Sequence, residues 1–301
     1  MPVLRFIFVL CLIILVSSGK QPYVKSAPEQ EEWMPLFNGK DLTNWDIKIA
    51  KHDLNENFNK NFYVKNGVIK VDYCKYRKFD GEFGHLYYNK PFSYYKLKVE
   101  YRFIGEQLDG GPSYAYLNSG IMLHSQPAIT VSKNQTFPVS LEFQLLASDE
   151  KEKRHNGNLC TPGTEVSMNG KIVDAHCIDS KSKNSFVNEW VTAEAVVYGD
   201  SLIEHIINGD TVLTYEKPHV GGGFVNNDVR WSWGGFGKDS LDWIKKAGTP
   251  LTSGFIALQA ESHPVEFRKV ELLELEGCMD SKALNYKSYF IKADNSKCRY
   301  K

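Results

Sequence analysis

The chain of 301 residues is long enough for one large β domain and a small appendage, because β-sandwiches often run to about 200–250 residues as single domains. Its 36 lysines and arginines balance its 36 aspartates and glutamates, so no basic face is predicted and we expect no nucleic-acid partner. The 16 tyrosines and 6 tryptophans suit both strands and sugar binding, and therefore favour neither over the other.

Residues 1–19 have the pattern of an export signal. A positive charge at Arg5 precedes an apolar run over 6–16, and small residues over 17–19 suit a cleavage site. A membrane anchor is the alternative, but the run is shorter than the ~20 residues that span a bilayer. Polar residues and proline predict a linker over 20–31. We expect a secreted or periplasmic protein without a membrane span in the mature chain.

Period-2 alternation predicts β-strands over most of residues 32–276. Apolar side chains alternate with charged ones over 96–103, and alternation returns over 191–197. Three Asn-Gly pairs predict two-residue hairpins, because a type I′ turn needs φ > 0 at both positions: Asn66-Gly67, Asn169-Gly170 and Asn208-Gly209. Many strands, tight turns and no βαβ rhythm predict an all-β fold, a two-sheet antiparallel sandwich or jelly roll.

Departures from this pattern are few. A short helix is predicted near Asp239 to Ala247, ended by Gly248. Longer stretches without clear periodicity lie at 104–116, 148–163 and 218–250. Loops of that length are usually functional or mobile.

The cysteines predict two disulfides in an exported chain. Cys160 and Cys177 flank the Asn169-Gly170 turn almost symmetrically, so a hairpin there brings them nearly opposite each other. Closing a loop of that length is worth roughly 3 kcal/mol in the chain-entropy model. Cys278 and Cys298 bracket a polar tail, which predicts a small disulfide-closed module over 277–301. Cys74 is then left over, and we expect it to be a buried thiol.

Several strand-like runs place polar side chains on one face, since residues i and i+2 of a strand point the same way. They contain Glu142, Gln144, Gln259, Glu261, Glu266 and Arg268, with His124 ending one run and His205 between two isoleucines. A solvated outer face is one explanation, because antiparallel sheets commonly expose one polar face. The residue types favour a sugar site, since carboxylates, amides, arginine and histidine offer planar, titratable partners to hydroxyls, whereas a solvated face is usually rich in lysine.

Two further histidine positions lie outside these runs. His155 stands in a loop beside Asn156-Gly157, where a lone histidine is more often exposed than catalytic. His176 and Asp179 straddle Cys177, and one such spacing does not define a metal site.

Two familiar hydrolytic motifs are missing. Retaining glucanases of the laminarinase type carry Glu-x-Asp-x-x-Glu on one strand, whereas the run that starts at Glu142 has Gln144 and Ala147 at the other acidic positions. The carboxylate pair of that mechanism is therefore absent from this strand. No Gly-x-Ser-x-Gly elbow is present, which argues against a lipase-like serine hydrolase.

Four segments resemble the 3-keto-disaccharide hydrolase family. They are Trp33-Met34-Pro35-Leu36-Phe37-Asn38-Gly39-Lys40-Asp41-Leu42-Thr43-Asn44-Trp45, Asn118-Ser119-Gly120-Ile121-Met122-Leu123, Leu141-Glu142-Phe143-Gln144-Leu145-Leu146 and the run 256–268. The resemblance extends from Trp33 to about Glu276. The tail, from Gly277-Cys278-Met279-Asp280 to Cys298, resembles a short Cys-bounded module of secreted proteins of the Bacteroidetes type.

The family resemblance implies a concanavalin A-like jelly roll and the cleavage of glycosides oxidised to a ketone at C3. The ketone acidifies the C2 proton, a base removes it, and the C1 glycosidic oxygen leaves by β-elimination from the enolate. Water then adds to the unsaturated sugar. Such a site needs a base near C2, a group that stabilises the enolate oxygen, and an acid for the leaving group.

Residue type and face assign hypothetical roles to these groups. Glu142 or His155 is the predicted base. Glu261 and Gln259 would bind hydroxyls or protonate the departing oxygen. Arg268 and His124 would hold the ketone or enolate. The remaining residues predicted to bind substrate are Gln144, Glu266 and His205. A divalent metal held by some of these carboxylates and histidines would also suit the site, without an identity for the ion.

Two non-enzymatic hypotheses remain open. A carbohydrate-binding module without catalysis would use stacking aromatics such as Trp231 and Trp233, and would leave its ligand intact. An adhesion or structural protein displayed through its tail is the other. The expected partner is an oxidised glycoside for the enzyme and another carbohydrate for the binding module.

Overall fold

The computed structural model describes residues 30–150, 152–173, 175–221, 234–236 and 239–301. The predicted signal, most of the predicted linker, Trp231 and Trp233 lie outside these residues. By their contacts, Glu31–Lys301 form one unit, which includes the tail. No helix among the described residues is both long enough and apolar enough to cross a bilayer.

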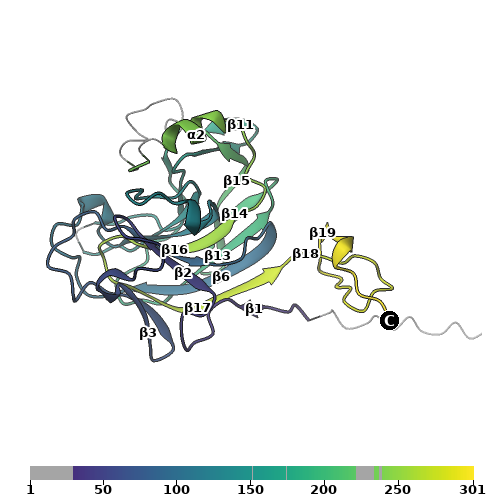
Figure 1. Ribbon diagram of the computed structural model, residues 1–301, viewed down its shortest axis with the longest axis horizontal. Coiled ribbons are helices and arrows are strands. Elements are labelled where there is room, and N and C mark those ends of the chain that lie inside the picture. The colour runs from purple at the N-terminus through teal and green to yellow at the C-terminus, as the bar shows by residue number, and fades with distance from the viewer. Residues whose placement is uncertain (1–29, 151, 174, 222–233, 237–238) are drawn as a thin grey trace, which may run out of the picture. The chain divides into compact units, whose positions relative to one another are not determined.

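Two antiparallel sheets form the body of the protein. The ten-stranded sheet has the order β11-β10-β15-β14-β13-β6-β17-β4-β3, with β1 paired to β17 (Figure 1). Its strands are β1 (Met34–Pro35), β3 (Phe62–Lys65), β4 (Val68–Val71), β6 (Tyr94–Phe103), β10 (Thr164–Met168), β11 (Lys171–Val173), β13 (Val191–Tyr198), β14 (Ile203–Ile207), β15 (Asp210–Val220) and β17 (Val265–Glu274).

The seven-stranded sheet has the order β12-β9-β8-β7-β16-β5-β2. Its strands are β2 (Trp45–Ile49), β5 (Gly84–Tyr88), β7 (Asn118–Ser125), β8 (Leu141–Leu146), β9 (Asn158–Cys160), β12 (Cys177–Ile178) and β16 (Phe255–Ala260). Strand β16, near the end of the domain, lies between two strands formed much earlier in the chain. The two sheets confirm the predicted all-β sandwich.

Alternation explains how the sheets pack. Along β6 every second side chain is buried, and Leu97 and Val99 are fully enclosed. On the facing sheet, Phe143, Leu258 and Leu86 enter the same core. Burying these side chains supplies the main stabilising free energy of the domain, at roughly 25 cal/mol per Å² of apolar surface. The alternate residues of β8, β16 and β5 consequently point away from the core.

The predicted turns are confirmed. Asn66-Gly67, Asn169-Gly170 and Asn208-Gly209 join β3 to β4, β10 to β11 and β14 to β15, and all of these residues have positive φ. Helix α2 (Ser240–Lys245) lies within the predicted helix, and Gly248 follows with φ +79°. The 3₁₀ turns are η1 (Phe58–Lys60), η2 (Ser113–Ala115), η3 (Ala128–Thr130) and η5 (Asn295–Lys297).

Both predicted disulfides are present. Cys160–Cys177 joins β9 to β12, where the two residues are direct register partners. Cys278–Cys298 closes the tail, in which β18 (Glu276–Gly277) pairs in parallel with β19 (Lys292–Ala293). The prediction for Cys74 is wrong, because its side chain is exposed. It lies in the turn after β4, where its backbone N–H donates to Asp72 Oδ1 at 2.7 Å.

Candidate functional site

A row of polar residues crosses the outer face of the seven-stranded sheet, the face turned away from the core. Register pairs Asn158 with Gln144, Gln144 with Gly120, Gln259 with His85, and His85 with Lys48. The pairing of β16 with β7 continues this line from Gly120 to Gln259. We call these six residues the polar row: Asn158, Gln144, Gly120, Gln259, His85 and Lys48.

Two carboxylates flank the polar row. Glu142 lies two residues before Gln144 on β8, and Glu261 lies two residues after Gln259. A Cβ atom at position 120 would lie 2.8 Å from Glu142 Oε1 and 2.9 Å from its Cγ. The side chain of Glu142 therefore folds across Gly120, which explains why the centre of the row carries a glycine.

Burial controls the charge of this pair. Glu142 and Glu261 are 6% and 3% exposed. Burial raises the pKa of Glu142 to about 8. Burial, and then the charge of Glu142, raise the pKa of Glu261 well above its usual value. Each group affects the titration of the other, and burial favours the protonated form of both at neutral pH.

Unpaired hydrogen-bonding atoms gather around the carboxylates. Five buried atoms here have no hydrogen-bond partner among the described residues: Asn118 Oδ1, His85 Nε2, Gln259 Oε1, Gln259 Nε2 and Glu261 Oε2. Asn118 lies two residues before Gly120 and so shares its face. Buried polar atoms in folded proteins are nearly always paired. Such a concentration indicates a place built to bind a polar ligand.

The segment after β7 covers one side of the row with apolar contacts. Tyr87, Met122 and Ala257 form the adjacent row of the sheet, and they pack against Ala128 and Val131. This cover separates part of the polar row from solvent, which strengthens electrostatic interactions within it.

The loop over 104–116 borders the opposite side. Gln107 Nε2 donates to Ser262 Oγ at 2.9 Å, and Asn118 Nδ2 donates to Tyr114 O at 2.9 Å. Burial, followed by the charge of Glu261, raises the pKa of Tyr114 to about 12. This long stretch, predicted to be functional or mobile, therefore lies beside Glu261.

A family model for the 3-keto-alpha-glucoside-1,2-lyase-like domain matches residues 32–273. The chain belongs to this family. It is accordingly a carbohydrate-active domain of a family of 3-keto-glucoside lyase-like enzymes, and the outer-face cluster lies within the matched residues. No curated protein matches the chain.

Solved structures with a similar fold include two candidate glycosyl hydrolases from Parabacteroides distasonis. One is 21% identical with a TM-score of 0.46, covering 81% of this chain and 94% of that one. The other is 17% identical with a TM-score of 0.47, covering 81% and 100%. A laminarinase from Rhodothermus marinus is 10% identical with a TM-score of 0.44, covering 82% and 99%.

Within this family domain, four predicted site residues come together: Glu142, Gln144, Gln259 and Glu261. Glu266 and Arg268 belong to β17 of the other sheet. Glu266 is buried against Lys70 and Arg102, with Arg102 Nε at 2.8 Å. The exposed Arg268 pairs with Glu100 at 2.5 Å. Both residues form their ion pairs within the ten-stranded sheet, and neither belongs to the polar row.

The predicted histidines also lie elsewhere. His205 is inside the core, where its ring stacks on Phe143 with centroids 3.9 Å apart. His124 Nε2 lies 3.0 Å from Gly199 O, and its ring contacts Tyr95 edge-on. His155 is exposed, with Nδ1 2.8 Å from Ser182 O. No described contact joins any of these histidines to the carboxylate pair.

Sequence reasoning missed Lys48, His85, Asn118 and Asn158. Lys48 and His85 alternate with core residues on β2 and β5, and this alternation was the available signal. No three His, Cys, Asp or Glu side chains in the described part of the chain group as ligands for a metal ion.

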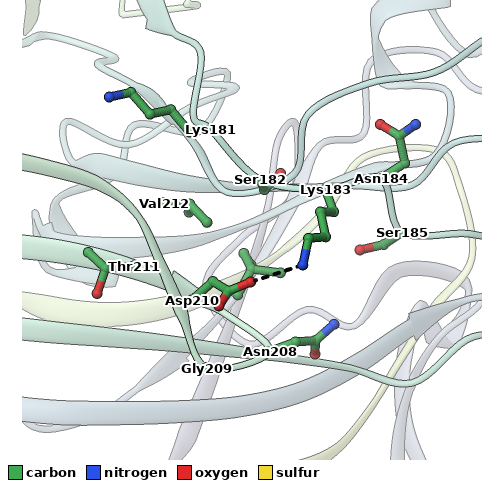
Figure 2. A pocket seen from close by; sticks show the side chains of 11 residues that line it. Lys181, Ser182, Lys183, Asn184, Ser185, Asn208, Gly209, Asp210, Thr211 and Val212 are labelled. Atoms are coloured by element: carbon green, nitrogen blue, oxygen red, sulfur yellow. Dashed lines mark ion pairs between the residues drawn. The ribbon is translucent and has the colours of Figure 1, made fainter.

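A separate pocket of about 660 Å³ lies at the β14–β15 turn (Figure 2). Residues 181–185 and 207–212 line it, and Lys183 faces Asp210 across it at 3.6 Å. Its buried hydroxyls, Ser182 Oγ and Ser185 Oγ, already accept hydrogen bonds from Asn156. None of its lining residues belongs to the polar row.

Proposed function

We propose that the protein cleaves glycosides oxidised to a ketone at C3, and that the reaction takes place over Gly120. The observation that carries this proposal is the buried pair Glu142 and Glu261, whose pKa values are both raised and which lie beside unpaired hydrogen-bonding atoms. A base with a pKa near the working pH and an acid that keeps its proton are what β-elimination and hydration need.

Glu142 is the base in this proposal, because its carboxyl lies across Gly120, where the reaction is proposed to take place. Its carboxylate takes the C2 proton, and the electrons of that C–H bond form the enolate of the C3 ketone. As the enolate collapses, the bond between C1 and the glycosidic oxygen breaks. Glu261 gives its proton to the departing oxygen.

In the hydration step the same two residues exchange their acid and base roles. The Glu261 carboxylate takes a proton from water as the water oxygen bonds to C1, and Glu142 returns its proton to C2. The sum of both halves is hydrolysis. If the unsaturated sugar leaves before water adds, the outcome is a lyase reaction.

Amides along the row supply the binding groups. Gln144 and Asn158 lie on one side of Gly120, while Gln259 and Asn118 approach it from β16 and β7. An amide both donates and accepts, and so can pair with sugar hydroxyls in either direction.

The alternative of a carbohydrate-binding module leaves the acid pair without a role. Burying two carboxyl groups next to each other costs stability, and a surface that only binds hydroxyls does not need it. The sequence pattern of residues 1–19 and the two disulfides support a further part of the proposal, that the protein acts outside the cytoplasm.

Assay of a 3-keto-glucoside and its unoxidised parent tests the proposal. We expect the keto compound alone to release its aglycone, because only the ketone acidifies the C2 proton. Glu142→Gln should lower the rate by about 10²–10⁴-fold. His155→Gln is the matched control and should stay within about twofold of wild type. Repeating the assay with EDTA measures any dependence on a divalent metal.

Three outcomes would count against it. Cleavage of only the unoxidised glycoside contradicts the elimination chemistry. Binding of the keto compound without release supports the carbohydrate-binding alternative. A full rate in Glu142→Gln removes Glu142 from the reaction.

A further inference from the structure

We infer that His85 is a further catalytic residue, whose Nε2 atom donates a hydrogen bond to the C3 oxygen as it becomes an enolate. This inference rests on the proposed function. It gives an identity to the third group that the elimination requires, beside the base and the acid.

None of the residues predicted from the sequence to stabilise the enolate lies at the site. Arg268 lies on the outer face of the other sheet, and His124 Nε2 is engaged with Gly199 O. The polar groups described near the carboxylates include the amides of the row, His85, Lys48 and Tyr114.

The position of His85 fits the role. It is the register partner of Gln259 on one side and of Lys48 on the other, two strands from Gly120 in the sheet order. The side chain is buried at 2% exposure, and its Nε2 has no partner in the described part of the protein. A buried imidazole nitrogen facing a polar ligand site is a ready hydrogen-bond partner.

Lys48 adds a fixed positive charge behind the imidazole. Its Nζ donates to His52 O at 2.7 Å and to Ile49 O at 3.4 Å, and only 4% of the residue is exposed. These bonds hold the ammonium in place, so it cannot turn out to solvent. Negative charge that develops on the enolate oxygen is favoured at this end of the row and not at the neutral end formed by Gln144 and Asn158.

His85 stays neutral in this environment. Burial, and then the charge of Lys48, lower the pKa of His85 to about 3. A neutral imidazole has one N–H, and it can polarise a carbonyl without transferring its proton, as neutral histidines do in other enzymes that form enolates. The C2 proton consequently goes to Glu142, while His85 keeps its own.

Hydrogen exchange at C2 isolates this step from the loss of the leaving group. The probe is 1,5-anhydro-3-keto-glucitol, which has hydrogen in place of the glycosidic oxygen at C1 and therefore has no glycosidic leaving group. In D₂O, wild type should exchange the C2 proton, followed by NMR. His85→Phe should exchange about 100-fold more slowly, the loss typical of one oxyanion donor. His219→Phe, on β15 of the other sheet, is the matched control and should exchange like wild type.

Two further measurements guard against a folding defect. His85→Gln keeps a neutral donor and should stay within about tenfold of wild type. In wild type labelled with ¹⁵N-histidine, the Nε2 signal of His85 should shift on addition of the keto compound and not on addition of 1,5-anhydroglucitol.

The outcomes separate this inference from the proposed function. If wild type does not exchange the C2 proton, the proposed function itself fails. If wild type exchanges and folded His85→Phe keeps the full rate, the enolate does not depend on His85. An Nε2 signal that does not shift on addition of the keto compound would likewise overturn the inference.

Discussion

At the scale of single residues, the protein keeps the carboxyl groups of Glu142 and Glu261 protonated. The unfolded chain releases these protons near the ordinary pKa of 4.5, whereas the folded protein holds the proton of Glu142 to about pH 8. The folded state therefore binds more protons in this window. Its free energy of unfolding falls as pH rises from about 4.5 to 8.

Replacing Glu142 by glutamine should flatten that slope. Between about pH 5 and pH 8, the free energy of unfolding of wild type should fall by about 2–4 kcal/mol relative to Glu142→Gln. Urea unfolding at each pH measures both curves. Glu106→Gln changes an exposed carboxyl and should run parallel to wild type. Parallel curves for Glu142→Gln would show that Glu142 is not held protonated.

The sequence could predict which residue types form the site but only some of the residues themselves. Glu142 and Gln259 could be predicted because alternation along a strand shows which side chains share one face of a sheet. Glu266 and Arg268 show the same alternation, and no local pattern tells which of two sheets a strand will join. His205 and His85 each have apolar residues two positions before and after them. The side chain of His205 nevertheless lies in the core, whereas that of His85 lies on the outer face. The difference is fixed by register with distant strands.

At the scale of elements, local signals were sufficient for turns and insufficient for strand order. Each Asn-Gly pair specifies its own hairpin, because the positive φ values are a property of those two residues. The place of β16 between β7 and β5 depends on contacts between remote parts of the chain. This placement brings Gln259 and Glu261 to Glu142, so the sequence could name both acids but not show that they lie near each other.

The disulfide at the edge of the seven-stranded sheet should stabilise the whole domain. Strand β12 pairs only with β9, through Cys177 with Cys160 and Ile178 with Leu159. The double variant Cys160→Ser/Cys177→Ser should lose about 3 kcal/mol of unfolding free energy, since a crosslink separated by 17 residues restricts the unfolded chain.

Urea unfolding without reductant measures this loss. Cys278→Ser/Cys298→Ser opens a crosslink in the tail and is the comparison, with little effect expected on the unfolding of the sandwich. An equal loss in both double variants would indicate that the tail and the sandwich unfold together.

At the scale of the whole molecule, the site is confined to one sheet. The tail contacts the sandwich at the end of β17, where Ile291 N donates to Leu275 O at 2.9 Å and Lys297 pairs with Glu274 at 3.4 Å. No residue of the polar row takes part in these contacts, so we expect the proposed site to be complete without the tail.

Removing residues 277–301 should therefore leave cleavage of the 3-keto-glucoside within about twofold of wild type. The melting temperature should fall by no more than about 2–4 °C, the shift expected for roughly 1 kcal/mol in a domain of this size. The assay and a thermal melt of the shortened chain check both. A folded but inactive shortened protein would place part of the catalytic apparatus in the tail.

The central position of β16 also has a consequence for the order of synthesis and folding. This strand is made after nearly all of the others, yet it supplies the middle of the site. A chain still emerging from the ribosome has β7 and β5 with no strand to join them, and its pairings are mostly long-range, which slows folding. The nascent protein is thus without activity until its last core strands are complete. Under the proposed export, that delay would keep the proposed reaction away from sugars inside the cell.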